Sequence, residues 1–120
     1  MILTKRIYGY KENDSYYKIF VDRLWPRGIS KSEVIWNEWI KDIAPSMELR
    51  KWFGHKPENW NEFKSRYKIE LSQKPDLTYR IRDFEKMYGT VVLLYAAKDQ
   101  EHNNANIIKE YLVENNLLRL

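Results

Sequence analysis

Three short segments of the chain concentrate apolar, β-branched and aromatic residues in the pattern of β-strands. Residues 2–8 (ILTKRIY) and 16–21 (YYKIFV) lie on either side of a polar stretch, GYKENDS, that is typical of a turn. Residues 90–96 (TVVLLYA) are apolar on both faces, as in a strand at the middle of a sheet covered on both sides. We therefore expect a small sheet with residues 90–96 at its centre.

Two helices are expected before residue 72, because capping residues and apolar spacing agree there. Ser46 suits the N-cap of a short helix, MELRKWF, and Gly54 suits its end. Pro57 suits the first position of the next helix. The apolar residues that then recur at helical spacing, on the face expected to point inward, are Trp60, Phe63, Tyr67 and Leu71.

Two further helices are expected around the central strand. Pro75 begins the first and Gly89 ends it, with an apolar face between them. The second runs from about His102 to Asn115 and follows the polar loop KDQEHNN. Between the second strand and Ser46 the pattern is less regular. Ser30 or Ser32 could cap a short helix up to about residue 36, and residues 36–43 fit either a helix or a strand.

The order of these elements predicts one α/β domain over residues 1–120. Strands alternate with helical segments, so we expect a small, at least partly parallel sheet with helices on both faces. The chain has no cysteine, which excludes disulfides and thiolate catalysis and is consistent with a reducing cytoplasm. Because no apolar run approaches the length of a membrane span or a signal core, we expect a cytoplasmic protein without membrane contact.

Charge and motifs limit the classes of function. A net charge of +4 tolerates anionic partners but is too small to imply nucleic-acid binding without a clustered basic face. The sequence has no P-loop, dinucleotide-binding glycine motif or EF-hand, and with two His and no Cys a zinc site is not expected. We predict no cofactor and no metal. Whether Asp22, Asp42 and Asp99 could share a divalent cation is left open by the sequence.

The first candidate site segment is VDRLWPRG, which leaves the second expected strand. Arg23 and Arg27 present guanidinium groups that suit phosphate or carboxylate, and Asp22 adds a carboxylate. Pro26 stiffens this loop, and Gly28 allows close approach of a ligand to the backbone. The alternative is that Asp22 and Arg23 form an internal ion pair.

The second candidate segment, YAAKDQEHNNA, leaves the central strand and enters the last helix. Ligands of open α/β sheets bind outside the carboxyl ends of strands, and a helix N-terminus favours anions. Asp99, His102, Asn103 and Asn104 supply a carboxylate, an imidazole and two amides at this point. The alternative is helix capping by Asp99 or Asn103, although one cap does not require four polar side chains.

The third candidate segment surrounds the short helix after Ser46. Ser46 lacks the motif of a hydrolase nucleophile, so we interpret it as a helix cap. Arg50 and His55 could reach a shared pocket from this helix. For His55 the alternative is a simple interaction with the negative end of the helix dipole.

The segments VDRLWPRGISK, WIKDIAPS, LRKWFGH, WNEFKSRYKIEL and LLYAAKDQEHNNA occur in this order and spacing. Together they resemble the YeaO-like family, domain of unknown function number 488, over nearly the whole chain. The resemblance implies a small bacterial or archaeal cytosolic α/β protein and implies no activity. Lys98 stands where the family often has arginine. The polar motif positions of the family fall on Asp22, Arg23, Arg27, Lys41, Asp42, Ser46, Arg50, His55, Arg66, Asp99, His102 and Asn103.

Two classes of function are compatible with these residues. The first is an enzyme, or a relative of one, that binds a small anion such as a nucleotide or another phosphorylated or carboxylated compound. In this hypothesis the acid–base residues are Asp22, Asp99 and His102. The ligand-binding residues are Arg23, Arg27, Lys41, Arg50, Asn103 and Asn104.

The second class is a nucleic-acid-associated or regulatory module that uses interleaved bases and aromatics, as in KSRYK and RKWFGHK. We favour the first class. If the second and the central strand run parallel, their carboxyl ends share one edge of the sheet. We therefore predict one concave pocket lined by Asp22, Arg23, Arg27, Asp99, His102 and Asn103. The oligomeric state does not follow from the sequence.

Overall fold

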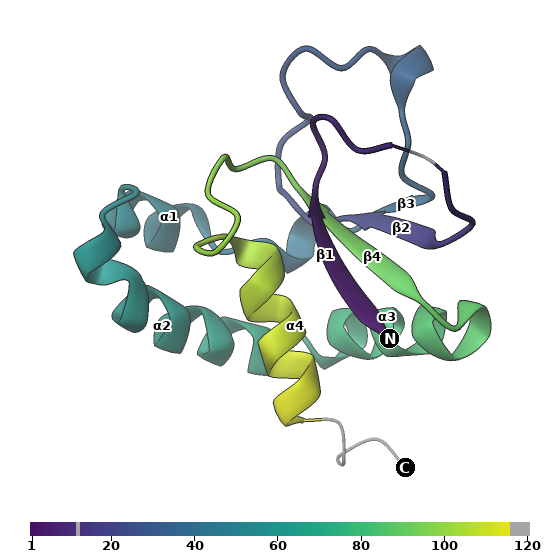
Figure 1. The fold of residues 1–120 in the computed structure, drawn as a ribbon. Helices are drawn as coiled ribbons and strands as arrows, with labels where there is room; N and C mark the ends of the chain where they lie inside the picture. Colours follow the sequence, from purple (N-terminus) through teal and green to yellow (C-terminus); the bar gives the residue numbers. More distant parts are fainter. Residues whose placement is uncertain (12, 116–120) are drawn as a thin grey trace.

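The structure, a computed structural model, describes residues 1–11 and 13–115 (Figure 1). Its strands are β1 (Ile2–Arg6), β2 (Tyr17–Phe20), β3 (Glu38–Trp39) and β4 (Val91–Tyr95). Its α-helices are α1 (Met47–Phe53), α2 (Trp60–Ser72), α3 (Pro75–Tyr88) and α4 (Asn104–Glu114). Three short 3-10 turns complete it: η1 (Lys31–Glu33), η2 (Lys41–Ile43) and η3 (Pro57–Asn59). The α/β class is confirmed.

The four described strands form one parallel sheet in the order β1-β4-β2-β3. Every residue of β4 is buried, because the strand pairs on both edges and is covered on both faces. The central position predicted for this apolar segment is therefore confirmed. Since β2 and β4 are parallel neighbours, the loops that follow Phe20 and Tyr95 leave the same edge of the sheet.

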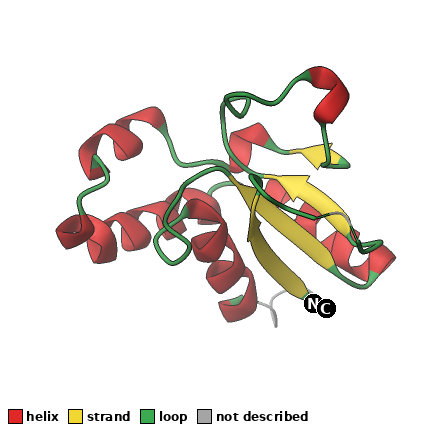
Figure 2. Cartoon of the chain, turned by 45° about the horizontal axis from the view of Figure 1, so that its top comes forward, coloured by secondary structure: helices red, strands yellow, loops and turns green. Residues whose placement is uncertain are grey.

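The two faces of the sheet are covered by different kinds of structure. On one face, apolar residues of all four α-helices pack against alternate strand residues such as Ile19 and Leu93. On the other face, Phe20 and Leu94 pack against aromatic and aliphatic residues of loops, including Trp36. Figure 2 shows the loops and the short η1 turn that stand on this second face. Helices were expected on both faces, but loop aromatics take their place on the second one.

Local signals position α1 at the edge where the sheet strands end. The Ser46 hydroxyl accepts a hydrogen bond from the Leu49 N–H at 3.1 Å, which satisfies a free donor of the first turn. Glu70 of α2 accepts from both the Ser46 N–H and its hydroxyl, at 2.9 and 2.6 Å. Gly54 ends the helix in the left-handed region at φ 55°. These contacts hold α1 against α2.

Element boundaries differ from the sequence-based expectations in the less regular segments. Ser30 precedes only the three-residue turn η1, and its N–H and hydroxyl donate to Glu33. Residues 36–43 contain both the short strand β3 and the turn η2. Pro57 begins η3, so α2 starts at Trp60. No described helix is long and apolar enough to cross a membrane.

Candidate functional site

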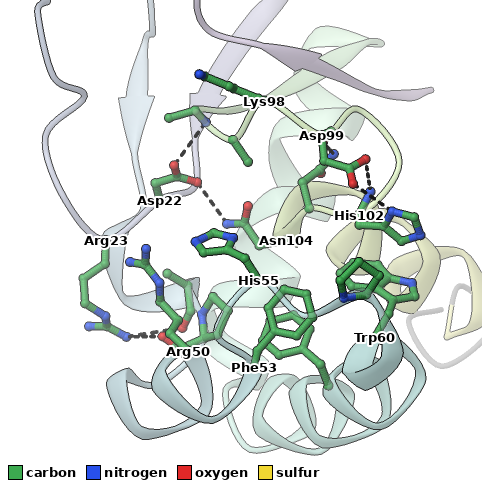
Figure 3. A pocket seen from close by; sticks show the side chains of 17 residues that line it. Asp22, Arg23, Arg50, Phe53, His55, Trp60, Lys98, Asp99, His102 and Asn104 are labelled. Atoms are coloured by element: carbon green, nitrogen blue, oxygen red, sulfur yellow. Dashed lines mark hydrogen bonds and ion pairs between the residues drawn. The ribbon is translucent and has the colours of Figure 1, made fainter.

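A cavity of about 540 Å³ lies where the loops after β2 and β4 face α1 and the start of α2 (Figure 3). The first loop contributes Asp22 and Arg23, and the second contributes the segment 96–99 with the first residues of α4. The complete lining is Asp22, Arg23, Ala44, Pro45, Arg50, Phe53, His55, Pro57, Trp60, Phe63, Ala96, Ala97, Lys98, Asp99, His102, Asn103 and Asn104.

Asp22 lies at the junction of the two strand-end loops. Its Oδ2 accepts the Ala96 N–H at 3.1 Å, and its Oδ1 accepts the Asn104 amide at 3.1 Å. Burial raises the pKa of Asp22 above its usual range, although these two hydrogen bonds and the charge of Arg50 oppose the shift. Ionisation of Asp22 is therefore less favourable inside the site than it would be in water.

Asp99 and His102 form a hydrogen-bonded pair at the opposite side of the cavity. Asp99 Oδ1 accepts the N–H groups of His102 and Glu101, and Oδ2 lies 2.9 Å from Nδ1 of His102. The backbone donors of His102 and Glu101, followed by the His102 ring, lower the pKa of Asp99 to about 2. At neutral pH Asp99 is an anion that orients the imidazole and is not a proton donor.

The two asparagines at the start of α4 have different roles. Asn103 is buried and caps the helix, since its Oδ1 accepts the Asn106 N–H at 3.0 Å and its Nδ2 donates to the Asp99 carbonyl. Asn104 donates through Nδ2 to Asp22 and to the Val21 carbonyl, both at 3.1 Å. Asn103 is therefore a helix cap, as in the alternative interpretation of this segment. Asn104 instead joins α4 to the end of β2.

Arg23 lines the cavity, but backbone oxygens engage part of its guanidinium group. Its Nη2 donates to the carbonyls of Ala44 and Pro45 at 3.2 and 3.3 Å, and Nη1 lies 3.8 Å from Asp42. The internal pairing of Arg23 with Asp22, which was the alternative interpretation, is replaced by these contacts.

Two residues expected at the site lie outside this lining. Arg27 belongs to the turn whose Trp25 packs on the second face of the sheet, and the Arg27 carbonyl accepts from the Tyr8 hydroxyl. Lys41 is exposed, and its ammonium lies 5.8 Å from the Trp39 ring. The prediction that Arg27 and Arg23 share a pocket is therefore wrong, because the loop between them turns toward the other face.

Sequence reasoning did not assign Phe53, Trp60 or Lys98 to the site. Trp60 was interpreted as core because it begins the apolar stripe of α2, yet it is only half-buried and lines the cavity. The spacing of Phe53, three residues after Arg50, was the available signal, since such positions share one helix face. His55, considered but not selected, also lines the cavity and has a left-handed φ of 57°.

Among the described residues, the acidic side chains do not form a cation site. Asp42 is absent from the cavity lining that contains Asp22 and Asp99. Within residues 1–11 and 13–115 there is no group of three or more His, Asp or Glu side chains that could hold a metal ion.

Comparison with known proteins identifies the family. Residues 1–119 match the model of the family described as the inactive DUF488-N3 subclade. The uncharacterised protein YeaO of Escherichia coli (strain K12) is 40% identical over 111 residues, which covers 92% of this chain and 96% of that protein. An uncharacterised protein of Mycobacterium tuberculosis (strain ATCC 25618 / H37Rv) is 35% identical over 113 residues and 92% of each chain. No solved structure shows a significant match. The chain therefore belongs to the YeaO-like DUF488 family, in the subclade described as inactive.

Proposed function

We propose that the protein binds a small phosphorylated or carboxylated ligand in the cavity between the strand-end loops and α1. The observation that carries this proposal is the state of Arg50. Its side chain is exposed, lines the cavity and makes no hydrogen bond or ion pair within the described part of the chain. Its guanidinium group is therefore free to form two parallel hydrogen bonds with an anion.

The charge around Arg50 supports the choice of an anion. Lys98 also lines the cavity, and no described residue forms an ion pair with it. Arg23 adds a third positive charge, against the two carboxylates Asp22 and Asp99. Because Asp22 already accepts two hydrogen bonds from protein donors, a ligand anion would be drawn toward Arg50 and Lys98.

Binding without turnover is the form of this function that we favour. The matching subclade is described as inactive. The chain has no cysteine, which excludes catalysis by a thiolate. Asp99 is held as an anion by three hydrogen bonds, so its role in the proposal is to orient His102 toward a ligand. The strained backbone of His55 supports a ligand contact there too, since such strain is concentrated at binding sites.

The nucleic-acid alternative receives no support from the basic segment KSRYK. Lys64 and Lys68 pair with Glu110 at 3.5 and 2.6 Å, and Arg66 pairs with Glu62. The positive charges of these basic side chains are balanced by acidic side chains on the helix surface, so they do not form a free positive face.

We propose that the binding function is exercised in the reducing cytoplasm, in agreement with the cysteine-free composition.

The test compares two neighbouring residues of α1. Arg50→Gln removes a cation that lines the cavity without an ion pair among the described residues, whereas Lys51→Gln removes an exposed cation of the same helix that does not line it. A panel of phosphorylated and carboxylated metabolites is screened by thermal shift, and affinities of those that bind are measured by calorimetry. We expect Arg50→Gln to weaken binding about ten- to a hundredfold, as for loss of a charge-assisted hydrogen bond.

Lys51→Gln is the matched control and should bind like the wild type. Equal affinities of the two variants, or a panel in which no anion binds at millimolar concentration, would refute the proposed function. Neither side chain makes a hydrogen bond or ion pair within the described residues, so Lys51→Gln should melt like the wild type, and Arg50→Gln should lose only its favourable charge interaction with Asp22.

A further inference from the structure

The cavity has an aromatic wall opposite its polar strand-end loops. The rings of Phe53, Trp60 and Phe63 are mutually packed, with centroids 5.8 Å apart for Phe53 and Trp60 and 4.4 Å apart for Phe53 and Phe63. All three rings line the cavity, and Phe53 and Trp60 are only half-buried, whereas Phe63 is buried. The apolar surface on this side is therefore available to a ligand.

The imidazole ring of His102 lies roughly perpendicular to this aromatic wall. The His102 imidazole lies 4.9 Å from the Trp60 ring at an interplanar angle of 79°. Asp99 holds the imidazole in this orientation through the contact at Nδ1. A flat ligand ring that stacks on the Trp60 or the His102 ring would meet the other of these two rings edge-to-face. Stacked and edge-to-face arrangements are both favourable for aromatic groups. Figure 3 shows Trp60 and His102 next to each other at one side of the cavity.

The cation and the aromatic wall are placed by the same helix. Arg50 and Phe53 are three residues apart on α1, so they lie on one face with Cβ atoms roughly 5–6 Å apart. Both residues line the cavity. The residue that carries the free guanidinium group and a residue of the aromatic wall thus project from neighbouring positions of one helix face, so a ligand with a ring and an acidic group can contact both.

We propose that the ligand of this cavity is an aromatic or heteroaromatic ring that carries a phosphate or carboxylate group. The ring packs against Trp60 and Phe53, and the anionic group binds Arg50. The inference rests on the anion-binding function proposed above and specifies its ligand class. An aliphatic anion would occupy the charged part alone and would leave the aromatic surface in contact with water.

The size of the cavity agrees with this class. A volume of about 540 Å³ lies within the usual range for small-molecule sites. It exceeds what a bare phosphate or acetate requires and suits a ligand with a ring, such as a nucleoside monophosphate. Lys98 at the polar end is then available to a sugar or to another hydrogen-bonding linker.

The experiment uses matched ligands on the wild-type protein, so that folding of a variant is not at issue. Calorimetry compares a nucleoside monophosphate with the corresponding ribose phosphate and the free nucleoside, and benzoate with acetate. Since stacking of one base on an aromatic side chain typically changes affinity about fivefold to a hundredfold, we expect at least about fivefold tighter binding of the ring-bearing member of one anion pair. The phosphate and carboxylate pairs distinguish the two kinds of anionic group.

The outcomes separate this inference from the function on which it rests. If neither ring-bearing anion binds more tightly than its ring-free partner, although an anion binds, the ligand class is wrong and anion binding stands. If the free nucleoside binds as tightly as its phosphate, or if no anion binds, the proposed function itself fails, and the inference with it.

Two tryptophan variants provide a second measurement. Trp60→Leu should reduce the affinity for the ring-bearing anion to that of the ring-free one, and it should leave the ring-free anion unaffected. Trp52→Leu is the control, because Trp52 is exposed outside the cavity and packs against Arg66. Equal effects of the two substitutions on the ring-bearing anion would overturn the inference.

Discussion

Asn104 and Asp22 are 82 positions apart in the chain and are joined by a hydrogen bond of 3.1 Å. The same amide of Asn104 donates to the Val21 carbonyl, and the other oxygen of Asp22 accepts the Ala96 N–H. The ends of β2 and β4 and the start of α4 are thereby tied together. This contact therefore joins the two loops that contribute to the polar side of the cavity.

Replacing Asn104 with alanine should destabilise the protein by roughly 1–3 kcal/mol, because a partly buried carboxylate loses a donor and a carbonyl loses its partner. Asn61→Ala is the control, since Asn61 is exposed on α2 and its side chain makes no hydrogen bond within the described residues. Urea unfolding measures both. Equal losses in the two variants would show that the Asn104 contact does not stabilise the fold.

Asp22 should make the stability of the protein depend on pH, and asparagine at this position should remove that dependence. Burial raises its pKa in the folded state above the ordinary value of 3.8, so folding carries a cost when the carboxylate is ionised at neutral pH. The cost disappears as the pH falls through the folded pKa toward 3.8. Relative to Asp22→Asn, the wild type should therefore gain stability between neutral pH and about pH 4.

Urea unfolding of the wild type and of Asp22→Asn at both pH values measures this difference. NMR titration of the Asp22 carboxyl carbon checks the cause directly. A midpoint at or below 3.8 would contradict the effect of burial.

Asp99 should show the opposite dependence. Its pKa is lowered to about 2 in the folded protein from 3.8, mainly by the N–H groups of His102 and Glu101. Its stabilising contribution is complete above pH 3.8 and is lost as the pH falls toward about 2. The stability difference between the wild type and Asp99→Asn should therefore be constant above that range and decline below it. A difference that declines already near neutral pH would assign the effect to another group.

Arg23 and Arg27 should respond differently to substitution by alanine. Arg23→Ala removes donors from the carbonyls of Ala44 and Pro45 and should cost about 1–3 kcal/mol of stability. Arg27→Ala should leave both stability and anion binding within about 0.5 kcal/mol of the wild type, because its side chain is exposed outside the cavity. Thermal unfolding and calorimetry check both. A large loss of affinity in Arg27→Ala would return Arg27 to the site.

Several elements could be predicted because their causes are local. The Ser46 cap accepts a hydrogen bond from a residue three positions away, and Gly54 supplies the left-handed conformation that ends α1. Pro75 begins α3 as expected. The apolar run that became β4 is central because it has no polar face to expose to water. Such signals act within a few residues, so a sequence carries them directly.

The difference between Arg23 and Arg27 is of another kind. Both follow β2 in one loop, and both have the same chemistry. Which of them faces the cavity is decided by the packing of Trp25 against Trp36 and Trp39, which turns the intervening loop toward the second face of the sheet. Those contacts depend on the strand order and on the conformation of loops. Loops lack the regular spacing of apolar residues that makes helices and strands predictable from a sequence.

The amino-acid pattern is sufficient to predict the α/β class, the buried central strand, the helix caps and the polar character of the two loops that leave β2 and β4. Which side chains meet depends on the folded arrangement of the whole chain. This arrangement placed Arg50 and Trp60 beside those loops, and by burying Asp22 it raised the pKa of that carboxyl group. Capping and strand burial follow from neighbouring residues and local composition, so they can be read from the chain. Desolvation and charge proximity instead depend on groups distant in the chain, such as Asp22 and Asn104.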